Sequence, residues 1–168
     1  MISLGTSVSL STVFYYDSKD NHKIAILPKL LDGKRTIMFG GPAPFSRLET
    51  EQAVEFSNLS DQLLEHVDEI YAIYCQDSFV TREFQRSIEA KTGKKNIQFL
   101  ADGNGEFITK HFLSLDLSAN GLGLRSHRWA GVFNPNRELV FFKLDNFTRY
   151  NYTKPNSLLE YLKTNPLK

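Results

Sequence analysis

Residues 70–100 read IYAIYCQDSFVTREFQRSIEAKTGKKNIQFL, and this segment alone indicates the fold class. It opens with an apolar run at 70–75 and closes with another at 97–100, each of the length of a buried strand. Between these runs, Asp77 can cap a helix, apolar side chains recur every three or four residues, and Gly93 can end the helix. The order strand, helix, strand is typical of a parallel β-α-β unit.

The residues before this segment repeat the same pattern. Residues 35–39 (RTIMF) form an apolar run bounded by glycines, which predicts a buried central strand. Residues 48–67 predict an amphipathic helix, because apolar side chains fall three or four residues apart along one face. These side chains belong to Ala53, Phe56, Leu59, Leu63 and Val67. Further upstream, residues 12–16 and 23–26 predict a β-hairpin across a turn of polar residues.

The C-terminal third predicts an antiparallel addition to the sheet. Residues 106–112 suit a short helix, and the strands 129–133 and 139–144 are joined by a tight turn. A last helix at 157–163 is expected to be capped by Asn156 or Ser157. A parallel half followed by a hairpin and a closing helix is the thioredoxin-like layout. We therefore predict an α/β fold with a central mixed β-sheet flanked by helices.

Composition narrows the class of protein. The 168 residues are 41% hydrophobic and 23% charged, which suits one globular domain spanning 1–168. The net charge of +1 does not favour nucleic acid, and no apolar run is long enough to cross a membrane. We expect a cytoplasmic protein. One cysteine and four scattered histidines exclude a disulfide framework and predict no metal and no cofactor.

Three motifs resemble the type-5 (atypical two-cysteine) peroxiredoxins. Residues 99–107 (FLADGNGEF) match the family segment F-x-x-D-G-N-G-E-F, and residues 121–129 (GLGLRSHRW) are similar to L-G-x-G-x-R-S-x-R-[YF]. Residues 76–80 (QDSFV) resemble N-D-x-F-V. The similarity runs in order over roughly two thirds of the chain. It implies a peroxiredoxin fold, a symmetric homodimer and a role for Arg128, which matches the arginine that organises the family's active site.

The active-site loop departs from the family pattern. In the family this loop has the sequence P-G-A-F-T-P-x-C, in which the cysteine reduces the peroxide and the threonine hydrogen-bonds the peroxide. In this chain, residues 42–49 read PAPFSRLE. With Phe45 as the anchor, Pro42 matches the first proline, Ser46 replaces the threonine and Glu49 replaces the peroxidatic cysteine. The resemblance therefore implies a degenerate site without a thiol.

The residue at the cysteine position has two alternatives, because the helix that follows is one residue shorter than in the family. Leu48 or Thr50 could take the place of Glu49 there. A glutamate at the start of a helix and next to an arginine is favourable, because the helix N-terminus and the arginine side chain both carry positive charge. We therefore predict an ion pair between Glu49 and Arg128 that mimics the contact between thiolate and arginine.

The sequence and its resemblance to the family support two classes of function, and a third class has the least support. The first is a peroxiredoxin-like protein without peroxidase activity that binds, scaffolds or regulates, as a homodimer or as a heterodimer with an active peroxiredoxin. The second is a weak thiol-dependent peroxidase or redox sensor that uses Cys75, although a cysteine ending an apolar strand is more often buried and inert. The third is acid-base catalysis by Glu49 and Ser46, for which no complete set of groups is recognisable.

Four aromatic residues match family positions near the active site or the dimer contact: Phe45, Phe79, Phe107 and Trp129. Aromatic side chains commonly anchor interfaces, so these residues predict an apolar contact surface. His127, beside Arg128, is interpreted as structural.

Overall fold

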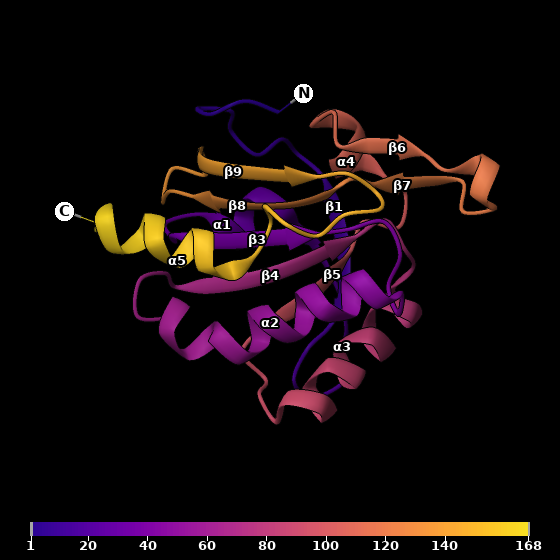
Figure 1. The fold of residues 1–168 in the computed structure, drawn as a ribbon, viewed down its shortest axis with the longest axis horizontal. Coiled ribbons are helices and arrows are strands. Elements are labelled where there is room, and N and C mark those ends of the chain that lie inside the picture. The colour runs from indigo at the N-terminus through magenta and orange to yellow at the C-terminus, as the bar shows by residue number, and fades with distance from the viewer. Residues whose placement is uncertain (1, 168) are drawn as a thin grey trace.

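A seven-stranded mixed sheet forms the centre of the molecule (Figure 1). The computed structural model describes residues 2–167. The strand order is β2-β1-β5-β4-β3-β8-β9, and the three central strands run parallel. These are β3 (Thr36–Gly40), β4 (Glu69–Tyr74) and β5 (Gln98–Ala101). Their side chains are almost all buried, as the continuous apolar runs in the sequence predict.

Antiparallel hairpins complete both edges of the sheet. One hairpin joins β1 (Thr12–Tyr16) to β2 (His22–Ile26), and the other joins β8 (Arg128–Phe133) to β9 (Leu139–Asp145). Because β8 pairs antiparallel with β3, the sheet is mixed, and the predicted architecture is confirmed.

Helices cover both faces of the sheet. Three lie on one face, α2 (Arg47–Leu63), α3 (Ser78–Thr92) and α5 (Pro155–Thr164), and the short helices α1 (Leu27–Leu31) and α4 (Glu106–Lys110) lie on the other (Figure 1). Each face has its own apolar core, so the sheet separates two hydrophobic clusters. None of the helices in residues 2–167 has the length and apolar character of a membrane span.

The predicted ends of α3 are confirmed. Asp77 accepts a hydrogen bond from the Val80 N–H at 2.9 Å, and Gly93 takes the left-handed conformation that ends the helix, with φ of 69°. Glycine adopts this conformation without the steric cost that a Cβ would impose.

Other boundaries differ from the sequence prediction. Helix α2 ends at Leu63, and Val67 is buried in the loop that follows. Helix α5 begins at Pro155 and its cap is Lys154 rather than Asn156 or Ser157, because proline has the fixed φ that suits a first helical position. The small sheet of β6 (Ser114–Asp116) and β7 (Leu124–Ser126), with a 3-10 turn at Ser118–Asn120 between them, was not predicted. Three residues are too few to show a period of two.

Candidate functional site

The first turn of α2 follows a short loop after β3, one of the three parallel strands in the middle of the sheet. Strand β3 ends at Gly40, and the chain then passes through Pro42 and Phe45 before α2 begins at Arg47. Phe45 has φ of 69°, a conformation that few residues other than glycine adopt. This sharp turn places the start of α2 at the carboxyl end of the parallel strands, where binding sites of α/β sheets usually lie.

The Glu49 carboxylate and the Arg128 guanidinium form an ion pair inside the protein. Arg128 donates from Nε to Glu49 Oε1 at 2.8 Å and from its Nη2 to the same oxygen. Each side chain is only 1% exposed, and Ser46 donates its hydroxyl to the other carboxylate oxygen. The predicted ion pair is confirmed. Of the three alternatives, Glu49 is the residue that contacts the arginine, whereas Leu48 and Thr50 are partly exposed.

Arg128 also contacts the backbone that follows β9. Its Nη1 donates to the carbonyl oxygens of Asn146, at 2.9 Å, and Arg149. One guanidinium therefore connects three parts of the chain: β8, the first turn of α2 and the segment after β9. Because five N–H groups in a fixed plane can satisfy several acceptors at once, arginine suits this position better than lysine.

The segment 145–153, which we call the strap, links β9 to α5 across α2. Asp145 organises it, because its carboxylate accepts the backbone N–H groups of Asn151, Tyr152 and Thr153 at 3.0 to 3.1 Å. Burial raises the pKa of Asp145, but these hydrogen bonds and the one from the Thr153 hydroxyl outweigh it and lower the pKa overall.

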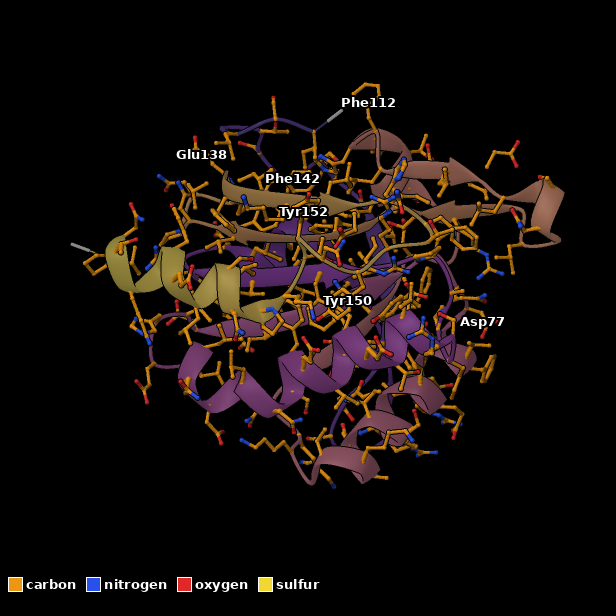
Figure 2. All side chains as sticks on the ribbon, in the orientation of Figure 1. Asp77, Phe112, Glu138, Phe142, Tyr150 and Tyr152 are labelled. Carbon is orange, nitrogen blue, oxygen red and sulfur yellow. The ribbon has the colours of Figure 1, made fainter. Side chains whose placement is uncertain are left out.

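Two further contacts fasten the strap to α2. Gln52 Nε2 donates to Thr153 Oγ1 at 3.2 Å, and the Tyr150 hydroxyl donates to Glu55 Oε2 at 2.8 Å. Glu49, Gln52 and Glu55 are spaced three residues apart, so they lie along one face of α2. Glu49 reaches the strap through Arg128. Figure 2 shows Tyr150 on this segment next to α2.

Tyr74 is a member of the site that the sequence did not indicate. It ends β4, is fully buried, and its hydroxyl has no hydrogen-bond partner among residues 2–167. Burial raises the pKa of Tyr74 far above its usual value, and the Glu49 carboxylate raises it further. In the sequence Tyr74 is one of several apolar residues in a strand, and nothing distinguishes it from its neighbours.

Cys75 lies apart from the ion pair. It follows β4, is half-buried, and its Sγ is 3.6 Å from the Leu124 carbonyl oxygen. Burial raises the pKa of the Cys75 thiol, and the negative charge of Asp102 raises it further. No hydrogen bond within residues 2–167 joins Cys75 to Ser46, Glu49 or Arg128. The Arg125 guanidinium lowers this pKa but does not outweigh burial and Asp102, so the thiol does not have the lowered pKa of activated cysteines.

The four aromatic residues divide into two groups. Phe45 and Phe79 are 53% and 65% exposed, so they are available for contacts. Phe107 and Trp129 are fully buried, and the prediction that they belong to a contact surface is wrong. They pack against each other, with ring centroids 5.7 Å apart, in the core on the α1 and α4 side of the sheet.

The remaining candidates do not add chemistry to the site. Burial lowers the pKa of His127, which favours its neutral form at neutral pH. No group of three His, Cys, Asp or Glu side chains within residues 2–167 is placed to hold a metal ion. The ion pair itself holds two opposite charges at the start of a helix, where the carboxylate is further stabilised by the helix dipole.

This geometry defines a thioredoxin-like α/β protein with its site where a helix begins at the carboxyl end of the sheet. Reduced Prx3 from Vibrio vulnificus in complex with hydrogen peroxide has the same fold, with a TM-score of 0.85 and 24% identity over 96% of this chain and 99% of that one. Among curated proteins, peroxiredoxin-2B from Arabidopsis thaliana is 33% identical and peroxiredoxin-2C from Oryza sativa subsp. japonica 32% identical. Each alignment has 131 residues and covers 77% of this chain and 79% of the relative. The chain belongs to the peroxiredoxin family. No family model matches it.

Proposed function

We propose that this chain is a type-5 peroxiredoxin homologue that has lost peroxide reduction and has a binding, scaffolding or regulatory role. The observation that carries the proposal is the buried ion pair between Glu49 and Arg128. In this proposal Pro42, Ser46, Glu49 and Arg128 are a degenerate peroxidatic site, with Glu49 at the position of the cysteine. Residues 1–168 then form one peroxiredoxin-like domain.

The chemistry of a carboxylate supports the loss of activity. A peroxiredoxin thiolate attacks a peroxide oxygen, becomes a sulfenic acid and is then reduced by a second thiol. A carboxylate has no comparable oxidation cycle, so Glu49 provides the charge of a thiolate without its reactivity. The Ser46 hydroxyl donates to this carboxylate and is therefore occupied within the protein.

Hydrogen peroxide is the substrate to test, because the related Vibrio vulnificus protein binds it in its solved structure. Peroxide consumption is measured with dithiothreitol as the reductant, for the wild type, for Cys75→Ser and for a protein-free control. We expect both proteins to match the control. Turnover in the wild type that disappears in Cys75→Ser would contradict the proposal.

That last outcome would establish the second candidate, a weak thiol-dependent peroxidase or redox sensor that uses Cys75. One observation favours it: Cys75 is half-buried rather than sealed in the core, so oxidants can reach the thiol. Its raised pKa counts against it, because the thiol form is a poor nucleophile. The acid-base alternative is disfavoured, because both Ser46 and Glu49 are engaged with each other and with Arg128.

The proposal includes a homodimer in the cytoplasm. Phe45 and Phe79 support the dimer, because both are large, apolar and exposed next to the start of α2 or α3. The single cysteine suits a reducing compartment. Sedimentation of the wild type and of Phe79→Ser tests the dimer: we expect a dimer that Phe79→Ser weakens, and a monomeric wild type would contradict it. Mixing with an active peroxiredoxin then distinguishes a homodimer from a heterodimer.

A further inference from the structure

Arg35 is a buried positive charge at the opposite end of α2 from the ion pair. The residue precedes β3 and is only 4% exposed. Helix α2 has 17 residues, so its two ends are about 25 Å apart at 1.5 Å per residue. This location is separate from Ser46, Glu49 and Arg128, and the inference below does not depend on the proposed function.

The Arg35 guanidinium has no carboxylate partner within residues 2–167. Its one side-chain hydrogen bond runs from Nη2 to the Asn165 carbonyl oxygen at 2.6 Å. The Asp68 carboxylate accepts the backbone N–H of Arg35 at 2.8 Å but forms no ion pair with its side chain. Buried charges in proteins are normally paired, since an unpaired one loses its hydration without compensation. By contrast, Arg128, which is also buried, is paired with Glu49.

A pocket of about 350 Å³ opens beside this guanidinium. Arg35 lines it together with His66, whose ring has no hydrogen-bond partner among the described residues. The rest of the lining is mixed: Leu64, Val67, Pro166 and Leu167 are apolar, whereas Glu65 and Asp68 are acidic. The pocket therefore combines a cation that has no carboxylate partner among residues 2–167 with four apolar side chains and two carboxylates.

We propose that the Arg35 pocket binds a small monocarboxylate with an apolar tail. The planar guanidinium fork matches the two oxygens of a carboxylate, and the apolar walls accommodate the tail. Two acidic residues, Glu65 and Asp68, also line the pocket. Their charges oppose a dianion more strongly than a monoanion, which favours a carboxylate over inorganic phosphate.

The test uses butyrate as the probe, titrated into isotope-labelled protein and followed by the backbone amide signals in NMR spectra. We expect saturable shifts at Leu64, His66 and Val67 and none at Ser46 or Arg128. Butanol, which has the same tail without the charge, and inorganic phosphate, which has charge without a tail, are expected to bind more weakly. Equal binding of butanol, tighter binding of phosphate, shifts confined to the Ser46 end, or no saturable binding would each overturn the proposal.

A pair of variants tests the role of the arginine. Arg35→Gln is expected to weaken butyrate binding by about tenfold or more, as the loss of a hydrogen bond to a charged group predicts. Lys91→Gln, which removes one exposed positive charge from α3, is the matched control and is expected to bind as the wild type does. Unchanged binding in a folded Arg35→Gln protein would overturn the proposal. If that variant does not fold, the map of wild-type shifts decides the question.

Discussion

Glu49 and Arg128 are 79 residues apart in the sequence and share a hydrogen bond of 2.8 Å in the folded protein. The contact joins the first turn of α2 to the start of β8, and both side chains are removed from water. Because the two charges are buried together, neither can be changed without leaving the other unpaired.

Replacing Glu49 is therefore expected to destabilise the protein. Glu49→Gln keeps the shape of the side chain but leaves Arg128 buried without its counter-charge, and we expect a loss of about 3 kcal/mol in the free energy of unfolding. Urea denaturation measures this change in the free energy of unfolding. Glu51→Gln is the matched control on the same helix. Glu51 forms an exposed pair with Arg47, so its loss is expected to cost less than about 1 kcal/mol. Equal losses of unfolding free energy in the two variants would show that the buried ion pair contributes no more to stability than the exposed one.

Placing a thiol at the same position is expected to create activity. In Glu49→Cys, made in the Cys75→Ser background, the new cysteine lies at a helix start beside the Arg128 cation, and both lower a thiol pKa. We expect dithiothreitol-dependent consumption of hydrogen peroxide. Glu49→Ser in the same background is the control, since it has the same size without the thiol. Equal rates for these two variants would count against Glu49 as the replacement for the peroxidatic cysteine.

Asp145 is expected to make the protein sensitive to acid. The pKa of its carboxyl is lower in the folded protein than its usual value of 3.8, so its contribution to stability is complete above that value. The contribution is lost as the pH falls through the lower pKa of the folded state. Asp145→Asn places an amide N–H₂ among the N–H donors of the strap and is expected to cost about 2 kcal/mol at neutral pH.

Unfolding curves of both proteins from pH 7 down to pH 2 check this pH dependence. The difference in stability between wild type and Asp145→Asn should be largest near neutrality and shrink below about pH 4. A difference that grows as the pH falls would contradict the account of Asp145.

Cys75 is expected to react slowly. Burial and the Asp102 charge raise its pKa, so the reactive thiolate is scarce at neutral pH. Alkylation by iodoacetamide should be slower in the native protein at pH 7 than in the protein unfolded in urea, which serves as the internal control. A native thiol that reacts faster than the unfolded one would instead support Cys75 as a redox centre.

The sequence was sufficient for the elements with strong periodicity. The apolar run 35–39, the helical spacing from Ala53 to Leu63, and the capping residues of α3 are local patterns, and the structure contains each of them. The ion pair followed from the position of Glu49 in a family motif and from elementary electrostatics. The edges of elements were less well predicted, because caps such as Lys154 depend on the surrounding chain as much as on residue type.

Features that depend on long-range packing were not predicted. Trp129 and Phe107 were assigned to a contact surface, yet they are core residues, since an aromatic side chain in a strand or helix suits either place. The Tyr74 hydroxyl has no hydrogen-bond partner within residues 2–167 and the Arg35 guanidinium has no carboxylate partner there, and such absences leave no pattern in the sequence. The strap has no periodicity, so its hydrogen bonds to α2 have no counterpart in the sequence.

The strap has a consequence for how the chain folds. Its contacts with α2 connect residues 95 and 101 positions apart, so they contribute to a high contact order. During synthesis, α2 leaves the ribosome long before Tyr150 and Thr153, so Gln52 and Glu55 have no strap partners until nearly the whole chain has emerged. The buried charge of Glu49 also stays unpaired until Arg128 of β8 has emerged. A nascent chain that ends before residue 145 would lack the strap's contacts with α2 and would expose the apolar core that α5 covers, which makes it a target for chaperones and proteases.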